Sequence, residues 1–278
     1  RTLLATLQAE YPFVRSQART LRGALGFDFV NQDVDLAGLD LTRDRLRVGF
    51  LRLTGDAVST DPGRGFSLVE PHWRLSGVLE LRRGLDVFGA TDDCGPAGID
   101  CLGPGDVPPS RIEGDATATV LRGSAYGEFR PAPKVTLALG VRGQLASNPL
   151  LSFEEFSAGN YTVGRGYDPG TLLGDKGIGL QSELRFGSVY PRSPRDFAIE
   201  GYGFFDYARI KNKDRLLIDD ESSRHLSSVG AGARASFDRF YLDAAIAIPL
   251  THVGPFDKKP DPRFLLSLTT RLWPWSVR

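Results

Sequence analysis

Hydrophobic and polar residues alternate with a period of two along much of the chain. In residues 73–82 the odd-numbered positions hold Trp, Leu or Gly, whereas Arg74, Glu80 and Arg82 stand at even-numbered positions. The same alternation recurs in three further segments: 135–142, 180–186 and 264–272. Because successive side chains of a strand point to opposite faces, this pattern predicts strands with one apolar and one polar face. A soluble β-sandwich would alternate in the same way.

Strand length distinguishes these two folds. Several alternating segments run past the five or six residues that are usual in globular sheets, which favours strands that cross a membrane. About eleven strands are expected, at residues 2–10, 18–33, 42–57, 67–83, 114–130, 134–147, 177–188, 196–210, 226–238, 240–250 and 262–273. No convincing amphipathic helix is found. The expected fold class is therefore all-β, a transmembrane antiparallel β-barrel.

The connections between these segments alternate between short and long. The mostly short connections are 11–17, 58–66, 131–133, 189–195 and 238–239, and the mostly longer ones are 34–41, 84–113, 148–176, 211–225 and 251–261. Transmembrane barrels have tight periplasmic turns and extended outer loops. We therefore expect the longer connections to face outward and the C-terminus to lie on the periplasmic side.

An odd number of strands has a consequence for the whole barrel. Bacterial single-chain barrels have even numbers of strands, and an open edge in lipid leaves backbone groups unpaired. The sequence contains no methionine and no signal-peptide pattern. We therefore expect residues 1–278 to be the C-terminal portion of a longer barrel protein, a portion that does not fold alone.

The composition of the chain excludes few further classes of protein. The 34 basic and 34 acidic residues cancel, so no nucleic-acid partner is expected. No apolar run approaches the roughly 18 residues of a membrane-spanning helix. No motif orders a Ser–His–Asp set, and no phosphate-binding loop is present. We expect neither an enzyme nor a cofactor.

The two cysteines, Cys94 and Cys101, are separated by a Gly- and Pro-containing segment that can bend back on itself. In an oxidising compartment such a pair forms a local disulfide, which we expect for an exported chain. Two free thiols are the alternative. A zinc site is not expected, because no histidine or second cysteine pair lies close by.

A glycine-rich loop between two expected strands carries Arg165 near its centre, and the apolar residues of this loop argue against disorder. If the loop folds into the lumen, its arginine needs an acidic partner on an inward strand face. Asp206 has that parity within residues 196–210, and so does Glu200. A solvated loop arginine facing a separate lumen carboxylate is the alternative.

Three stretches resemble one known family. "YPFVRSQ", "TVGRGYDPGTLLGDKG" and "FFDYARI" are similar to motifs of the two-partner secretion transporters, the haemolysin-activator and filamentous-haemagglutinin-transporter type. Three departures are visible. Gly164 separates Val163 from the arginine, Ala208 replaces a motif glycine, and the sequence ends in "RLWPWSVR" where outer-membrane barrels usually have a terminal aromatic residue. The resemblance implies a sixteen-stranded barrel whose first strands and periplasmic POTRA domains are absent from this chain.

The resemblance also implies roles for individual residues. The loop motif falls on Val163, Arg165, Gly166 and Tyr167, and the strand motif places its aspartate at Asp206. In the family this loop folds into the barrel, and the arginine pairs with the aspartate. Glu183, Arg185 and Glu200 are further candidates for lumen-wall charges, for which ordinary polar lining is the alternative.

The expected function is export of a partner protein through the barrel, in the bacterial outer membrane. The partners would be that exoprotein, outer-membrane lipid and the barrel-assembly machinery that inserts the barrel. A barrel-assembly or insertase relative of the same superfamily is one alternative. A passive porin or adhesin whose long loop projects outward is another.

Overall fold

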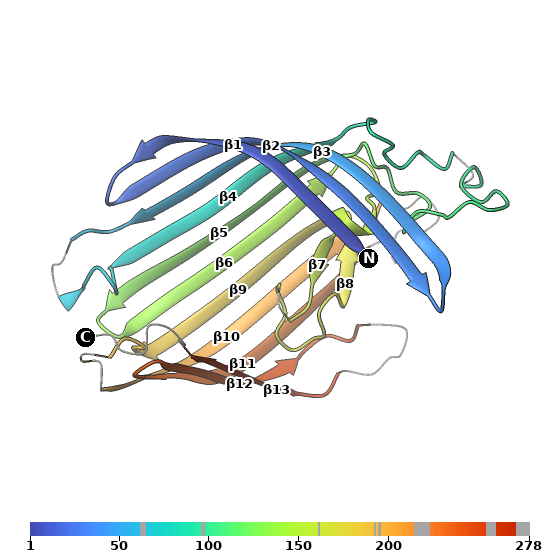
Figure 1. Ribbon diagram of the computed structural model, residues 1–278. Helices are drawn as coiled ribbons and strands as arrows, with labels where there is room; N and C mark the ends of the chain where they lie inside the picture. Colours follow the sequence, from blue (N-terminus) through green and yellow to red (C-terminus); the bar gives the residue numbers. More distant parts are fainter. Residues whose placement is uncertain are drawn as a thin grey trace.

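Eleven long strands form one antiparallel sheet that curls into a trough in the computed structural model (Figure 1). The structure describes residues 1–61, 65–95, 98–160, 162–191, 193, 196–213, 223–253 and 260–270. The strands are β1 (Thr2–Arg15), β2 (Arg19–Leu36), β3 (Leu39–Val58), β4 (Trp73–Gly84), β5 (Thr119–Ala132), β6 (Val135–Ala146), β9 (Lys176–Gly187), β10 (Phe197–Lys211), β11 (Ser223–Phe237), β12 (Phe240–Pro249) and β13 (Arg263–Thr270). Each expected strand is found, although the expected residues 271–273 lie outside the described part.

Every strand of the large sheet pairs with its neighbour in the chain, apart from one excursion. After β6 the chain leaves the sheet, forms β7 and β8, and returns as β9, which pairs with β6. Within the described residues, β1 pairs only with β2 and β13 only with β12, so the sheet has two edges. The all-β antiparallel architecture expected from the alternation is confirmed.

The two faces of the sheet differ as the alternation predicts. The outward face exposes large apolar side chains such as Leu79 (52% exposed) and Phe264 (67%). The inward face carries buried charged groups such as Glu80, Arg82 and Asp206. A continuous apolar outer surface on a curved sheet with a polar interior is the pattern of a barrel wall in lipid.

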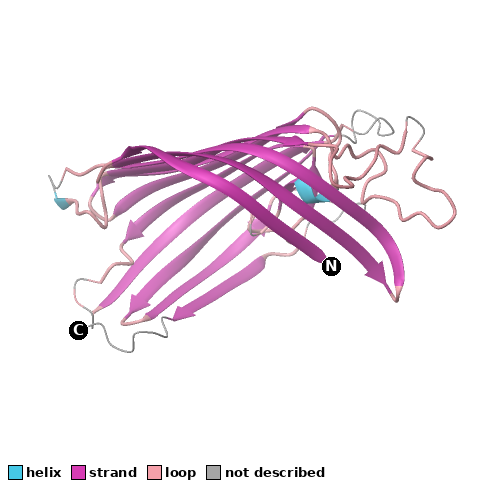
Figure 2. Ribbon diagram, turned by 45° about the horizontal axis from the view of Figure 1, so that its top comes forward, coloured by secondary structure: helices cyan, strands magenta, loops and turns pink. Residues whose placement is uncertain are grey.

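Two connections are shorter than expected. At 34–41 the strands continue to Leu36 and Leu39 and are joined by Ala37 and Gly38, both with positive φ (52° and 84°). This is the two-residue turn that matches strand twist, although the first residue is not the usual Asn, Asp or Gly. At 11–17, β1 continues to Arg15, since an edge strand tolerates Pro12. The β4–β5 and β6–β9 connections lie at the same end of the sheet (Figure 2).

Helical structure contributes little to the described chain. The element η2 (Ser152–Glu154) is a single 3-10 turn that lies between β6 and β7. No helix in the described ranges is long and apolar enough to cross a membrane.

The left-handed backbone at Ala37 predicts a stabilising substitution. Ala37→Asn should raise the unfolding free energy of the protein by about 1 kcal/mol, because asparagine tolerates this conformation better. Ala37→Val should lower it, since a β-branched residue at positive φ is strained. Urea unfolding midpoints in lipid would show both changes, and equal midpoints for the two variants would contradict the turn geometry.

Candidate functional site

The connection between β6 and β9 folds back onto the concave face of the sheet. It contains η2 and a hairpin of β7 (Phe156–Ala158) and β8 (Leu172–Gly174), which lies inside the curve of the wall (Figure 1). Loop residues Phe156, Ala158, Val163, Tyr167 and Leu172 form one buried cluster with Ala208, Ile210 and Leu226 of the wall. Each is at most 1% exposed, so the loop packs as a folded element.

Two glycines allow the loop to approach the wall closely. Gly164 has φ of +112°, and a Cβ there would lie 2.5 Å from the side chain of Leu226. A Cβ at Gly166 would lie 2.9 Å from the Cβ of Ser228 and 3.0 Å from the backbone nitrogen of Pro249. The extra residue Gly164, which separates Val163 from Arg165, is therefore a turn position that only glycine fits without strain.

Arg165 and Asp206 meet inside the trough. The Arg165 Nε donates to Asp206 Oδ2 at 3.0 Å and its Nη2 donates to Oδ1 at 2.7 Å, while its backbone N–H donates to Oδ2 at 2.9 Å. Asp206 is fully buried on β10. The guanidinium also lies 3.7 Å from the ring centroid of Phe204, two residues earlier on the same face. In this Arg165–Asp206 pair, the planar guanidinium binds both carboxylate oxygens and also stacks on the Phe204 ring. Lysine cannot reproduce this geometry.

The flanking motif residues hold the loop on either side of this pair. The backbone N–H of Gly166 donates to Ser228 Oγ at 3.3 Å. The Tyr167 hydroxyl accepts from the backbone N–H of Thr251 at 2.9 Å and lies 2.9 Å from the carbonyl oxygen of Ser227. Val163 is buried in the loop cluster. The four loop-motif residues therefore lie against β10, β11 and the end of β12.

Glu183 connects the loop arginine to the wall. Its carboxylate lies 2.5 Å from Arg165 Nη1, 2.7 Å from Arg185 Nε and 3.0 Å from Arg234 Nη1. Arg185 reaches Glu128 at 3.0 Å, and Arg234 reaches Glu200 at 3.2 Å. The expected wall charges Glu183, Arg185 and Glu200 therefore belong to one ion-pair network that includes the loop.

A second anchor was not predicted from the sequence. Arg82 of β4, only 2% exposed, donates to both oxygens of Glu154 in η2 at 2.7 and 3.0 Å. Its Nη1 also donates to Asp28 at 2.9 Å and to Glu80 at 3.0 Å. Three arginines and three carboxylates balance in this cluster, which consists of Arg52, Arg82, Arg122, Asp28, Glu80 and Glu154. The alternation of the sequence places Arg82 on the inward face of its strand, but no sequence pattern identifies Glu154 as its partner.

A third anchor fixes both ends of the loop at the end of the sheet where the β4–β5 connection lies. Asp175, fully buried, accepts from Arg111 at 2.6 Å, from the Leu150 backbone N–H at 2.7 Å and from the Lys213 backbone N–H at 2.7 Å. Arg111, from the β4–β5 connection, also binds Glu155 at 3.0 Å. One carboxylate thereby joins the base of the loop to two other outer connections.

The cysteine loop belongs to the β4–β5 connection. Cys94 and Cys101 form a disulfide, and the backbone N–H of Asp100 donates to the Cys94 carbonyl at 3.1 Å. No group of three or more His, Cys, Asp or Glu in the described ranges could hold a metal ion.

Solved structures of other proteins share this fold, and three of them are compared below. CdiB from Escherichia coli matches with a TM-score of 0.74 at 15% identity, over 96% of this chain and 45% of that one. CdiB from Acinetobacter baumannii gives 0.66 at 20% identity, over 96% and 41%. BamA from Haemophilus ducreyi lacking POTRA domains 1–3 gives 0.59 at 12% identity, over 96% and 54%. The chain thus spans about half the length of these proteins. No curated protein sequence matches it.

The apolar outer surface and the charged interior define an outer-membrane β-barrel protein. A family model described as haemolysin secretion/activation protein ShlB/FhaC/HecB matches residues 6–235, and the chain belongs to this family. The family membership and outer-membrane location expected from the loop and strand motifs are thereby confirmed.

Loss of the Asp206 carboxylate should free the loop. In an intact parent protein without other free thiols, Val163→Cys places a buried thiol that reports loop opening. Asp206→Ala leaves a buried arginine short of a partner, a change that costs about 3–5 kcal/mol in buried pairs. Maleimide labelling of the introduced thiol should therefore accelerate at least tenfold.

The matched control is Asp243→Ala. Asp243 pairs with Arg234 at 3.0 Å on the same inner wall, and it makes no hydrogen bond or ion pair with the described residues of the loop. Labelling should stay at its original rate in this variant. Equal acceleration in both variants would assign the effect to general loosening of the wall.

The Arg82 cluster predicts an asymmetry between its two partners. Arg82→Met leaves three carboxylates close together and should cost about 3–5 kcal/mol of stability, whereas Glu154→Gln leaves Arg82 paired with Asp28 and Glu80 and should cost about 1–2 kcal/mol. Urea unfolding of the intact parent protein measures both. A larger loss for Glu154→Gln would show that Glu154 is the more important member.

Proposed function

We propose that this chain is the barrel portion of a two-partner secretion transporter that exports an unfolded partner protein across the outer membrane. The observation that carries this proposal is the Arg165–Asp206 pair. It holds the family's loop motif against the inner wall and not in outer solvent. Family membership over residues 6–235 supports the same function.

The groups at this site bind and position but do not react. The loop occupies part of the trough, so export requires it to move or a path beside it to open. Breaking the Arg165–Asp206 pair leaves a buried charge unpaired, and replacement partners lower that cost. The pair would thus favour the closed arrangement while allowing release when other polar groups are supplied.

The barrel would be completed by further parts of the parent protein. The two edges at β1 and β13 carry backbone groups that lipid cannot satisfy, which supports additional strands between them. We propose that five more strands complete a sixteen-stranded barrel, that periplasmic POTRA domains bind the exported protein, and that the barrel-assembly machinery inserts the whole.

The likeness to BamA favours one alternative, a barrel-assembly relative, because the fold is common to both. A porin or adhesin with an outward loop is disfavoured, since the loop motif is buried against the wall.

Export can be tested by comparing the culture media of cells that contain or lack the intact parent protein. Quantitative mass spectrometry should find one large protein that reaches the medium only when the parent is present. Arg165→Ala should reduce its appearance at least several-fold, and Arg165→Lys should not restore it fully, since lysine lacks the planar fork. Identical media with and without the parent would contradict the proposal.

The same experiment separates export from activation. Activity of the exported protein recovered from the periplasm and from the medium can be compared at equal amounts. A higher activity in the medium would show that passage also activates the protein.

A further inference from the structure

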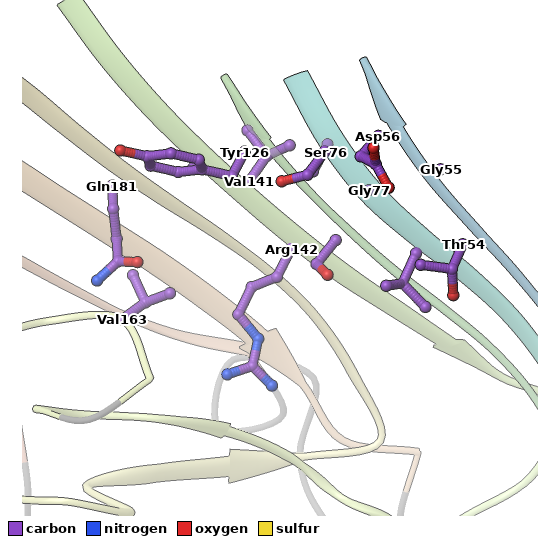
Figure 3. Close-up of a pocket in the computed structure, with 14 residues that line it drawn as sticks. Thr54, Gly55, Asp56, Ser76, Gly77, Tyr126, Val141, Arg142, Val163 and Gln181 are labelled. Carbon is purple, nitrogen blue, oxygen red and sulfur yellow. The ribbon is translucent and has the colours of Figure 1, made fainter. Parts of the chain in front are cut away.

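A cavity of about 340 Å³ lies between the loop and the wall strands away from the Arg165–Asp206 pair (Figure 3). We call it the β3–β6 cavity. Its lining includes Asp56, Ser76, Ser124, Arg142 and Gln181 from the wall, and Val163 from the loop. The cavity exists because the inward side chains here are small: serine on β4 and β5, and glycine at position 140 of β6.

Two other parts of the inner surface are filled. On the β10–β11 side, the loop cluster covers the wall with side chains that are at most 1% exposed. Toward the outer end of β2–β5, the Arg82 cluster occupies the interior. The β3–β6 cavity offers room and polar side chains beside the loop, on the inner face of the central strands.

Arg142 differs from the other lumen arginines around it. Arg82, Arg165, Arg185 and Arg234 each bind carboxylates. Arg142 is recorded with no carboxylate partner in the part of the chain described, and its guanidinium lies 4.6 Å from the ring centroid of Phe156. A guanidinium carries five N–H donors, which here face the cavity and not a fixed acceptor. Figure 3 shows its side chain projecting from the β6 wall.

We propose that the β3–β6 cavity is a contact site for the extended polypeptide during export, an inference that rests on the proposed function. Arg142 binds carbonyl oxygens and carboxylates of the passing chain. Ser76, Ser124 and Gln181 offer hydrogen bonds that any main chain can use. Because bonds between neutral groups are weak in net terms, the chain is not retained and moves on.

The cavity also places the exported chain beside the loop. Val163 lines it, two residues before Arg165. Val163 is only 1% exposed, so a polypeptide in the cavity would lie beside the loop next to the Gly164 turn. Occupation of the cavity and opening of the loop would then be coupled, because both change the surroundings of this residue.

Cross-linking tests the position of this path. The probe is the exported protein found by comparing media, with a single cysteine and a tightly folded C-terminal domain that stalls it in the channel. Ser124→Cys in the intact parent protein should form a disulfide with the probe. The matched control is Ser182→Cys on β9, whose hydroxyl donates to the Phe205 carbonyl on the opposite face of the wall.

The expected result is at least tenfold more cross-link at position 124 than at position 182. Equal or absent cross-linking at position 124, with export intact, overturns the cavity as the path and leaves the proposed function standing. A wild-type protein that exports nothing would be a different result, because it would contradict the proposed function itself.

A second measurement separates substrate contact from loop positioning. Arg142→Gln should slow the initial export rate several-fold, and Arg142→Lys should restore most of it, because a cation suffices for a transient contact. Labelling of Val163→Cys should stay unchanged in Arg142→Gln. The contrary result would be accelerated labelling in Arg142→Gln together with the same export defect in Phe156→Leu, which removes the ring beside Arg142. That result would show that Arg142 holds the loop, and it would overturn the role of Arg142 in binding the exported chain.

Discussion

Backbone hydrogen bonding in lipid is the constraint on which the rest of this structure depends. A strand that crosses the bilayer must place every N–H and C=O against a neighbouring strand, because lipid offers no partner. Long antiparallel strands result, with apolar side chains on the outer face and the remaining side chains on the inner face. The inner face therefore collects the charges that the outer face excludes, and these charges decide how the interior is organised.

Charges confined to the interior require partners, and the loop supplies several of them. Asp206 is fully buried, and its hydrogen-bonding partners include the side chain and backbone of Arg165. Arg82 is bound by two carboxylates of the wall and one of the loop. The loop is thus held by charge pairing at separate points, and apolar packing of its hairpin fills the space between them. Arg142 departs from this pairing and stands beside the β3–β6 cavity.

The sequence predicts the strands and the first anchor for physical reasons. The alternation and the length of the segments identify all eleven strands, because a membrane-spanning wall with one apolar and one polar face needs long strands with alternating side chains. The Arg165–Asp206 pair follows from inward parity together with two motifs. The hairpin of β7 and β8 is not predicted, since three-residue strands carry no period. Glu154 is not predicted either, because no strand parity sets its direction and Arg82 lies 72 positions away.

Attachment of the loop at both ends limits how far its tip can travel. Arg111 holds Glu155 and Asp175 at one end of the sheet, and Arg165 stands ten residues from each. Ten fully extended residues span at most about 33–36 Å. The apolar band of such barrels is about 25 Å tall. The loop is therefore a double tether whose extended reach exceeds the height of this band, so Arg165 can move along the full depth of the apolar wall while both attachment points stay in place.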